Sequence, residues 1–297
     1  MPLDPSLVGH ETSPETGVIR REDIRQFADA VGDTNPIYRD PEAAKLAGYR
    51  DVPAMPTFVT RFRVPFAEAG LDPQRSQVLH GEQEYVYTRP LVAGDTLTVR
   101  HRIATMREAG RGTMTIMTIE ALGDAPDGER VVTGRSTLIV REGASGTDAA
   151  ATGGAGEKKK SPPKIPEGER IPAIEKHVTQ EQINAYAEVS GDHNPIHLDP
   201  AAARAVGLDG TIAHGMLSMA FLGELLTNWL AARGVPGSWV ARLRVRFQAM
   251  VRPGDTLTAQ GALGRREGDR QELDVWIDNQ RGERVITGDA DVILPGA

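Results

Sequence analysis

The sequence predicts an α+β protein made of two copies of one folding unit, and three observations lead to this prediction. Helical and β patterns follow one another in the same order twice along the 297 residues. A turn reading Gly-Asp-x-Asn-Pro-Ile begins at Gly32 and again at Gly191. A stretch at 142–168, rich in small residues, lysine and proline, separates the two copies. Because self-similarity at a fixed spacing indicates repeated architecture, we expect a duplicated fold.

An amphipathic helix is expected at the start of each copy. Apolar residues at i, i+3, i+4 and i+7 spacing indicate one face of such a helix. The first copy has this pattern at Ile24, Phe27, Ala28 and Val31. The second copy repeats it 159 residues later at Ile183, Tyr186 and Ala187. Gly32 and Gly191 follow these patterns, and glycine is typical just past a helix C-terminus.

Further helices are expected after the turn. Asp40-Pro41 predicts the N-cap and first residue of a short helix, and Asp199-Pro200 repeats it. In the second copy, residues 214–233 are apolar on so many sides that we expect a helix buried inside a sheet. The corresponding stretch at 56–70 is also expected to be helical, with Pro65 ending or kinking the helix.

β patterns fill the rest of each copy. In the first copy we expect strands at 84–87, 96–103, 114–121 and 131–140, with glycine-containing turns between them. The pentapeptide Gly-Asp-Thr-Leu-Thr begins at Gly94 and recurs at Gly254. Each copy is therefore predicted to be an antiparallel sheet of about four or five strands, curled around a central helix.

The predicted domains are residues 1–141 and 169–297, joined by a flexible linker at 142–168. The linker contains three consecutive lysines from Lys158, followed by several prolines. Such a segment cannot bury enough apolar surface to offset its ordering entropy. The lysine run could be a docking patch, but a solvated linker charge run is the simpler interpretation.

Composition narrows the function classes. A net charge of −7 and a pI near 5.6 argue against a nucleic-acid surface. Cysteine is absent, which excludes disulfides, thiolate metal ligands and a cysteine nucleophile. No apolar run approaches the ~18 residues of a membrane span, and residues 1–17 are unlike a signal peptide. We expect a cytoplasmic protein that binds neither nucleic acid nor membrane.

The second copy carries the candidate site. Asp192 and His197 place a carboxylate and an imidazole five residues apart, a pair that can move a proton on a bound carbonyl compound. Asn194 can hold that carboxylate or a water by hydrogen bonding. Gly215 opens the long apolar helix, where a free amide and the helix dipole favour developing negative charge. Ser218 lies one turn further in and either touches a substrate or only packs.

Each of these residues also has a simpler interpretation. Asp192 alone could cap the turn that follows it, and His197 alone could be a partly buried histidine with a structural role. Together with the spaced His214-Gly215 pair, a functional site is favoured. His193 is expected to face solvent, and His214 to make hydrogen bonds at the start of the helix. A zinc site is not expected, because the histidines lack a convincing third ligand.

A family resemblance follows from these residues. The run from Gly191 to His197, with His214-Gly215-Met216 after it, resembles the signature of MaoC-type (R)-specific enoyl-CoA hydratases, also called hydratase 2. It is also similar to two-subunit (3R)-hydroxyacyl-ACP dehydratases, in which a subunit with a degenerate motif pairs with a catalytic one. The resemblance covers both halves outside the linker. It implies that each copy is a hotdog domain and the chain a double hotdog.

The resemblance implies reversible hydration of 2-enoyl thioesters to (3R)-3-hydroxyacyl thioesters. Asp192, Asn194 and His197 match the motif positions of the family, and Gly215 matches its oxyanion-hole glycine. The substrate would be a thioester of CoA or acyl carrier protein, and no cofactor or metal is required. Which of Asp192 and His197 is the base stays open. A homodimer is possible on general grounds.

The first copy has lost part of this chemistry. Asp33 and Asn35 are kept, but Tyr38 replaces the histidine, and tyrosine with a pKa near 10 is a poor base. Pro56 falls at or beside the oxyanion position and has no N–H. We expect this half to shape an acyl pocket without catalysing. If Pro65 breaks the helix, a long or bulky acyl chain gains room, lined by Phe58, Phe62 and Phe66.

Two alternatives have other chemistry. One is a non-catalytic acyl-thioester binding or scaffold protein, and the other is a hotdog acyl-CoA thioesterase. A serine hydrolase is not supported, because Gly-x-Ser-x-Gly does not occur. The sequence does not choose the acyl group, the carrier, the preferred direction, the oligomeric state or the pathway, whether fatty-acid metabolism or another.

Overall fold

The computed structural model describes residues 3–72, 76–110, 114–142 and 168–296. The strands of the first half are β1 (Glu15–Val18), β2 (Ser76–Tyr87), β3 (Thr96–Ala109), β4 (Met114–Asp124) and β5 (Arg130–Glu142). The strands of the second half are β6 (Arg170–His177), β7 (Trp239–Phe247), β8 (Thr256–Glu267), β9 (Arg270–Asn279) and β10 (Arg284–Ile293). All strands expected in the first half are confirmed, each longer than its sequence pattern indicated.

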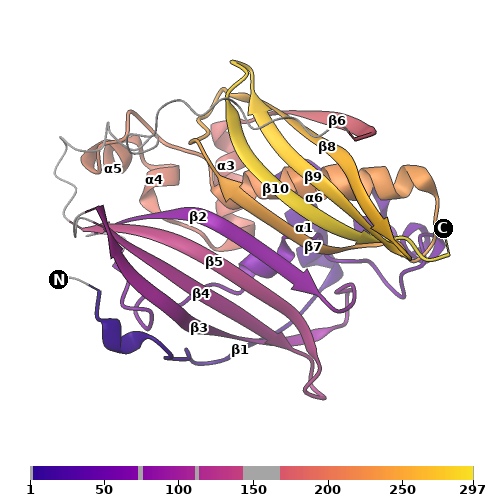
Figure 1. Cartoon of the computed structure of the whole chain (residues 1–297), viewed down its shortest axis with the longest axis horizontal. Coiled ribbons are helices and arrows are strands. Elements are labelled where there is room, and N and C mark those ends of the chain that lie inside the picture. Colours follow the sequence, from indigo (N-terminus) through magenta and orange to yellow (C-terminus); the bar gives the residue numbers. More distant parts are fainter. Residues whose placement is uncertain (1–2, 73–75, 111–113, 143–167, 297) are drawn as a thin grey trace.

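Within the described residues, the ten strands form one antiparallel sheet in the order β1-β3-β4-β5-β2-β7-β10-β9-β8-β6. The order is symmetric about the centre of the sheet: β2, β5, β4, β3 and β1 on one side correspond to β7, β10, β9, β8 and β6 on the other. Figure 1 shows the two halves side by side, with β2 and β7 meeting at the centre. The duplication expected from the sequence is thus present as a two-fold arrangement of the sheet.

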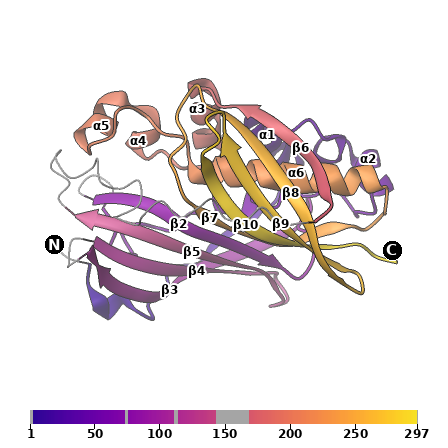
Figure 2. The same ribbon diagram turned by 45° about the horizontal axis from the view of Figure 1, so that its top comes forward.

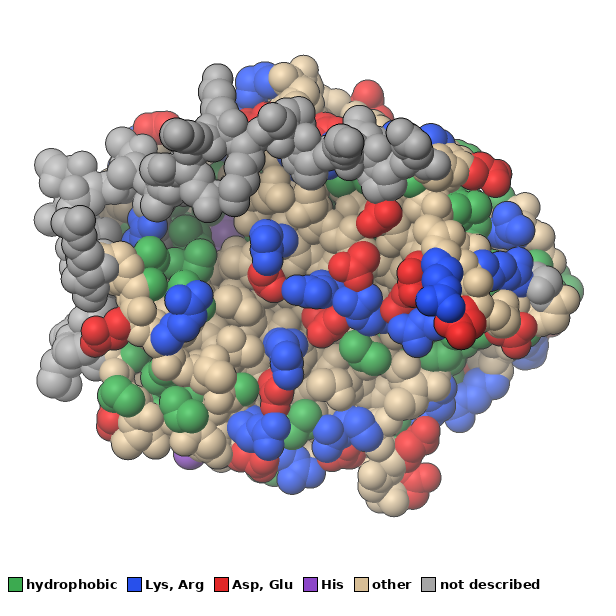
Figure 3. Space-filling model, in the orientation of Figure 1, with side chains coloured by type: hydrophobic (Ala, Val, Ile, Leu, Met, Phe, Trp, Pro, Cys, Tyr) green, Lys and Arg blue, Asp and Glu red, His purple; other side chains and the backbone are tan. Residues whose placement is uncertain are grey.

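Ion pairs reinforce the junction between β2 and β7. Glu84 lies opposite Arg244, and Arg242 Nε donates to Glu84 Oε1 at 2.6 Å. Glu82 pairs with Arg246 Nη2 at 2.5 Å. Acidic and basic side chains are intermixed across this face of the molecule (Figure 3). The Glu82–Arg246 pair is largely exposed, and exposed pairs are each worth only about 0–1 kcal/mol. Strand hydrogen bonding and the shared core therefore contribute most to the junction.

The first helices end as expected. α1 (Arg21–Val31) stops at Gly32, with φ 74°, and α3 (Gln180–Ser190) stops at Gly191, with φ 71°. Glycine adopts this left-handed conformation without a Cβ penalty. Two short helices follow the turns, α2 (Pro41–Leu46) and α5 (Pro200–Ala205), and their N-caps are Asp40 and Asp199. Both carboxylates accept a backbone N–H of the helix that they precede, so both predicted caps are confirmed.

The long helix of the second half, α6 (Gly215–Arg233), lies inside the curve of the sheet (Figures 1 and 2). Fourteen of its 19 residues are buried. The burial extends around the whole helix, as a helix without a polar face requires. The prediction of a central helix at 214–233 is confirmed, with His214 as the N-cap.

The described part of the first half contains no long helix, so the helix expected at 56–70 is wrong. In its place are a short 3-10 helix, η3 (Phe58–Arg61), and turns up to Gly70. Pro65 cannot donate to a helix and disfavours helical geometry at Val64 before it. The β-branched residues Val59 and Thr60 add little helix propensity. The sheet of the first half is therefore left partly unfilled.

Two edge strands were missed by the sequence patterns. β1 has four residues, and β6 exposes most of its side chains, so neither shows a regular apolar alternation. The predicted linker at 142–168 lies almost entirely outside the described residues, and its boundaries stay a prediction. Among the helices in the described ranges, none has both the length and the apolar character that crossing a bilayer requires.

Candidate active site

The turn after α3 builds the candidate site. Asp192 follows the left-handed Gly191, and its Oδ1 accepts the backbone N–H of Asn194 at 3.4 Å. The Asn194 side chain caps α4 (Pro195–Leu198) by accepting the Ile196 N–H, also at 3.4 Å. Asn194 thus holds the Asp192 carboxylate through its backbone, whereas the sequence suggested its side chain. α4 then brings His197 back toward Asp192.

His197 is held in one tautomer. Its Nδ1 lies 2.8 Å from the carbonyl oxygen of Ile212. Because a carbonyl only accepts, Nδ1 carries the proton and Nε2 keeps a free lone pair. Burial lowers the pKa of His197, although the Asp192 charge opposes that shift. His197 is 8% exposed and is a neutral acceptor at pH 7.

Asp192 forms an ion pair with an arginine from the other half of the chain. Arg63, in the segment after η3, places Nη1 3.0 Å from Asp192 Oδ2. Burial opposes ionisation of this carboxyl, but Arg63 and the neighbouring histidines outweigh it and lower its pKa to about 2. Asp192 is therefore a carboxylate at neutral pH.

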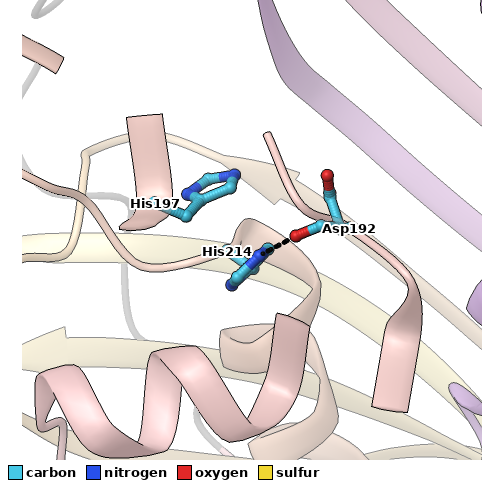
Figure 4. A group of neighbouring side chains, drawn as sticks. All are labelled: Asp192, His197 and His214. Atoms are coloured by element: carbon cyan, nitrogen blue, oxygen red, sulfur yellow. Dashed lines mark hydrogen bonds between the residues drawn. The ribbon is translucent and has the colours of Figure 1, made fainter. Parts of the chain in front are cut away.

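His214 lies beneath the pair. Its ring centroid is 3.8 Å from that of His197, and its Nε2 donates to the Asp192 backbone carbonyl at 2.9 Å (Figure 4). This confirms His214 as a hydrogen bonder at the helix start. Burial lowers its pKa to about 3, so the ring is neutral. His193, expected to face solvent, is half-exposed and lies 3.7 Å from Glu188.

The side chains of Asp192, His197 and His214 lie close enough together to be compared with a metal site. One ligand atom from each lies within 4.8 Å of the others. His197 and His214 each use one ring nitrogen on a backbone carbonyl, which leaves one nitrogen apiece. Structural zinc sites have four protein ligands, and catalytic sites have three with an open position. The expectation that no metal is needed stays a prediction.

Gly215 places an amide at the start of α6. Leu217 and Ser218 donate to the carbonyl of His214, whereas within the described residues the Gly215 amide has no acceptor. A Cβ at this position would lie 3.1 Å from Cε1 of Phe247. A larger residue here would therefore require a small shift of this aromatic ring or of the helix start. Ser218, one turn further into α6, is buried.

All the candidate residues face one cavity of ≈ 890 Å³. The second half contributes Asp192, Asn194, His197, Gly215 and Ser218 to its wall. The first half contributes apolar side chains, among them Val59, Phe62, Val64, Phe66, Val78 and Leu138. It also contributes polar ones, among them Thr60, Arg63, His80, Gln83, His101 and Ser136. The cavity thus enters the first half where its long helix is missing.

The aromatic lining is confirmed in part. Phe62 and Phe66 lie on the cavity wall, as expected from the sequence. Phe58 instead packs edge-on against Phe27 in the core, with ring centroids 5.5 Å apart. It does not line the cavity because η3 turns it inward, where it is 2% exposed. Arg63 and His80 were missed, and no motif in the sequence marks either residue.

The equivalent site in the first half is closed. Asp33 is fully buried, and its Oδ1 accepts the Asn35 N–H at 2.8 Å. The Asn35 side chain donates to Asn228 of α6 at 3.2 Å. Tyr38 is 1% exposed and borders a cavity of only ≈ 30 Å³, about the volume of one water. α6 therefore occupies the space that a substrate would need.

Comparison with known proteins covers both halves. Residues 6–134 match a family model described as "FAS1-like, dehydratase domain region", and residues 163–282 match one described as "MaoC like domain". A UPF0336 protein from Streptomyces avermitilis is 44% identical over 156 residues, which are 49% of this chain and 100% of that protein.

Solved structures agree in fold. One named MaoC-like dehydratase, 23% identical, superposes with a TM-score of 0.81 over 97% of this chain and 99% of its own. The RV0216 protein of Mycobacterium tuberculosis, described as having a double hotdog fold, is 14% identical with a TM-score of 0.66, covering 97% and 96%. The double hotdog expected from the sequence is confirmed.

Proposed function

The chain belongs to the MaoC-like dehydratases, as its sequence signature suggested, and we propose that it interconverts 2-enoyl and (3R)-3-hydroxyacyl thioesters. The observation that carries this proposal is the convergence of three groups on one cavity. They are the Asp192 carboxylate, the free Nε2 of His197 and the unpaired amide of Gly215. A hydratase needs a proton acceptor, a proton donor and an oxyanion donor, and these groups can supply all three.

Acid–base chemistry would use one water held between Asp192 and His197. In hydration, one O–H bond of that water and the C2–C3 π bond of the enoyl group break. The hydroxyl bonds to C3, and the former π electron pair takes a proton at C2. The neutral Nε2 of His197 can accept and return a proton, and the Asp192 carboxylate can accept a hydrogen bond from the same water. Dehydration follows the same path in reverse.

The thioester oxygen gains negative charge when C3 is attacked. The Gly215 amide at the start of a 19-residue helix can donate to that oxygen, and the helix dipole adds to the effect. Loss of one such donor typically costs about 2.7–4 kcal/mol of barrier. We therefore assign Gly215 to the oxyanion hole, and Asp192, His197 and Asn194 to the acid–base site. We also propose that Ser218, which lines the same cavity, can contact the thioester.

The acyl chain is proposed to extend into the first half. The missing helix leaves the cavity bordered there by Phe62, Phe66, Val78 and Leu138. A four-carbon acyl group would leave much of ≈ 890 Å³ empty. Burial of each further methylene is worth about 0.8 kcal/mol, so longer or bulkier acyl groups should bind more tightly. The carrier is CoA or acyl carrier protein.

A paired assay tests the reaction class. Loss of enoyl absorbance and release of free thiol are followed together, with crotonyl-CoA and with longer 2-enoyl-CoA thioesters. The proposal expects loss of absorbance without thiol, fastest with the longer chains, and an (R)-configured product. Release of thiol would instead support a thioesterase. Binding of acyl-CoA without either signal, at every chain length, would support a non-catalytic binding protein.

A further inference from the structure

Arg63 lines the cavity and has no role in the chemistry proposed above. It belongs to the half without the intact motif, yet its guanidinium lies 3.0 Å from Asp192 Oδ2 in the other half. The guanidinium carbon also lies 5.6 Å from the centre of the Phe66 ring, so the side chain is held from two sides. Its exposed fraction is 27%, and that of Asp192 is 14%. The pair is partly desolvated, where charge interactions are stronger than at the surface.

We propose that Arg63 is a positioning residue of the reaction: by pairing with Asp192 it keeps that carboxylate charged and oriented toward the substrate water. The first half would thus supply part of the acid–base machinery as well as the acyl pocket. This inference rests on the proposed hydratase function. It concerns a residue outside the Asp-x-Asn-Pro-x-His motif, and a contact that crosses between the two halves.

Among the groups that surround Asp192, Arg63 supplies the positive charge at pH 7. The titratable groups that face Asp192 are Arg63, His80 from β2, Tyr186 from α3, His197 from α4, and His214. Burial lowers the pKa of His80 to about 4 and that of His214 to about 3, and it also lowers that of His197. Because these rings are neutral at pH 7, Arg63 alone among these groups is then positively charged. Without it, Asp192 would be a largely buried carboxylate with no counter-charge.

Arg63 also acts on the histidine. Its positive charge is among the causes that lower the pKa of His197 and of His214. One guanidinium therefore favours both protonation states that hydration needs, the charged carboxylate and the neutral imidazole. Loss of Arg63 should raise the pKa of Asp192 and of His197 together. As the pH falls, both groups would then be protonated, and activity lost, at a higher pH than in the wild type.

Arg61 provides a matched control. It lies two residues earlier, at the end of η3, and its Nη2 is 3.4 Å from Asp23 in the same half. Its guanidinium stacks over Phe58 at 5.1 Å and does not line the cavity. The exposed fractions of Arg61 and Arg63 are similar, at 29% and 27%. Replacing either residue removes one positive charge from the same loop, but only Arg63 touches Asp192.

The experiment compares Arg63→Gln, Arg63→Lys and Arg61→Gln by two measurements. The first is histidine NMR titration without substrate, in which Arg63→Gln should raise the pKa of His197 and His214. The second is the pH dependence of kcat and KM with an enoyl-CoA. Its acid limb should move up by about one pH unit or more for Arg63→Gln, since an opposite charge at this distance shifts a carboxyl pKa by about 1–3 units. Arg63→Lys keeps the positive charge, so its acid limb should lie close to that of the wild type, and Arg61→Gln should match the wild type.

Several outcomes would overturn the inference. One is a folded Arg63→Gln variant in which neither the acid limb of the pH profile nor the histidine pKa values move. Another is an Arg61→Gln variant that shows equal shifts. A third is a rise in kcat in Arg63→Gln, which would mean that the ion pair restrains Asp192. If Arg63→Gln does not fold, Arg63→Met removes the same charge and takes its place in both measurements. The NMR titration needs no turnover, so a wild type inactive on every enoyl thioester would contradict the proposed function while the coupling of Arg63 to His197 is still measured.

Discussion

The two copies of the Gly-Asp-x-Asn-Pro turn have the same backbone and opposite electrostatics. Asp33 and Asp192 each follow a left-handed glycine, and each accepts the N–H of the asparagine two residues on. Burial raises the pKa of Asp33, whereas the pKa of Asp192 falls to about 2. The two cations that oppose this rise, Lys176 and Arg39, form ion pairs with Glu224 and Asp29 instead. The motif fixes a turn, and the neighbours decide its chemistry.

The neighbours differ because, in the ranges that the structure describes, the second copy has a long helix and the first does not. α6 packs Thr227 and Asn228 against the turn of the first copy and closes it. The first copy has only η3 to place against the turn of the second, so that site opens into the cavity. Each half therefore sets the accessibility of the other half's turn. An open site in one copy and a closed site in the other follow from a single missing helix.

The sharpest test of this contrast replaces each aspartate by asparagine. Asp192→Asn should lower kcat/KM for enoyl hydration by about 10²–10⁴-fold, the usual contribution of a general acid–base group. Asp33→Asn should keep most of the activity, because Asn can still accept the Asn35 N–H and Asp33 faces no cavity of substrate size. Steady-state kinetics with thermal melting of both variants checks this. A comparable loss in the two variants would contradict a single active site.

Substitutions at two glycines of α6 test whether the helix start has a role that the rest of the helix does not share. Gly215→Ala would bring a Cβ to 3.1 Å from Phe247, shifting the donor amide, and should lower kcat about 10-fold or more. Gly223→Ala would meet Pro56 at an ordinary 3.5 Å and should stabilise the protein by up to about 1 kcal/mol. Kinetics and urea unfolding of the pair check this. Equal kinetic effects would remove the special role of the helix start.

The pH dependence of stability should differ between the two sites. Burial lowers the pKa of His214, at the open site, to about 3 and that of His101, on the cavity wall, to about 4. The unfolded state then binds more protons below pH 6.5, so each histidine removes about 1.4 kcal/mol per pH unit as the pH falls toward its folded pKa.

Glu224, beside the closed site, works in the opposite direction. Burial raises its pKa to about 7, so the folded state binds the extra proton and gains stability as the pH falls from 7 to 4.5. Urea unfolding between pH 7 and 5 should therefore show a steeper loss for Glu224→Gln than for the wild type. An identical slope in the two proteins would show that Glu224 titrates normally.

The smallest expected effect comes from restoring the lost histidine. Tyr38→His in the Asp192→Asn background recreates an Asp–x–Asn–x–x–His arrangement in the first copy. We expect no recovery of hydration above the Asp192→Asn background, because the adjoining cavity is only ≈ 30 Å³ and α6 covers the turn. Measurable recovery would show that the first site is accessible after all.

Sequence patterns predicted much of this contrast. The helix ends at Gly32 and Gly191, the caps at Asp40 and Asp199, and the helix at 214–233 were all expected, because each depends on residues close together in the chain. Tyr38 and Pro56 marked the first copy as altered. The positions of Asp192, His197 and Gly215 around one cavity agree with the motif, and their roles stay proposals.

What the sequence could not predict depends on distant contacts. The stretch at 56–70 is apolar enough for a helix, but its shape is set by two prolines and by packing against the other half. The short β1 gains its strand character only by pairing with β3. Arg63 lies in no motif, and its partner Asp192 follows 129 residues later, so only the folded chain reveals the pair.

The continuous sheet through β2 and β7 has a consequence for symmetry. In a two-fold dimer of identical units every substitution is made twice, at equivalent positions. A helix deleted to enlarge one pocket would be deleted from the partner too, and an arginine added beside one carboxylate would appear beside both. Two different sequences in the two halves release the protein from this constraint. One half can then specialise in holding the acyl chain while the other keeps the reacting groups.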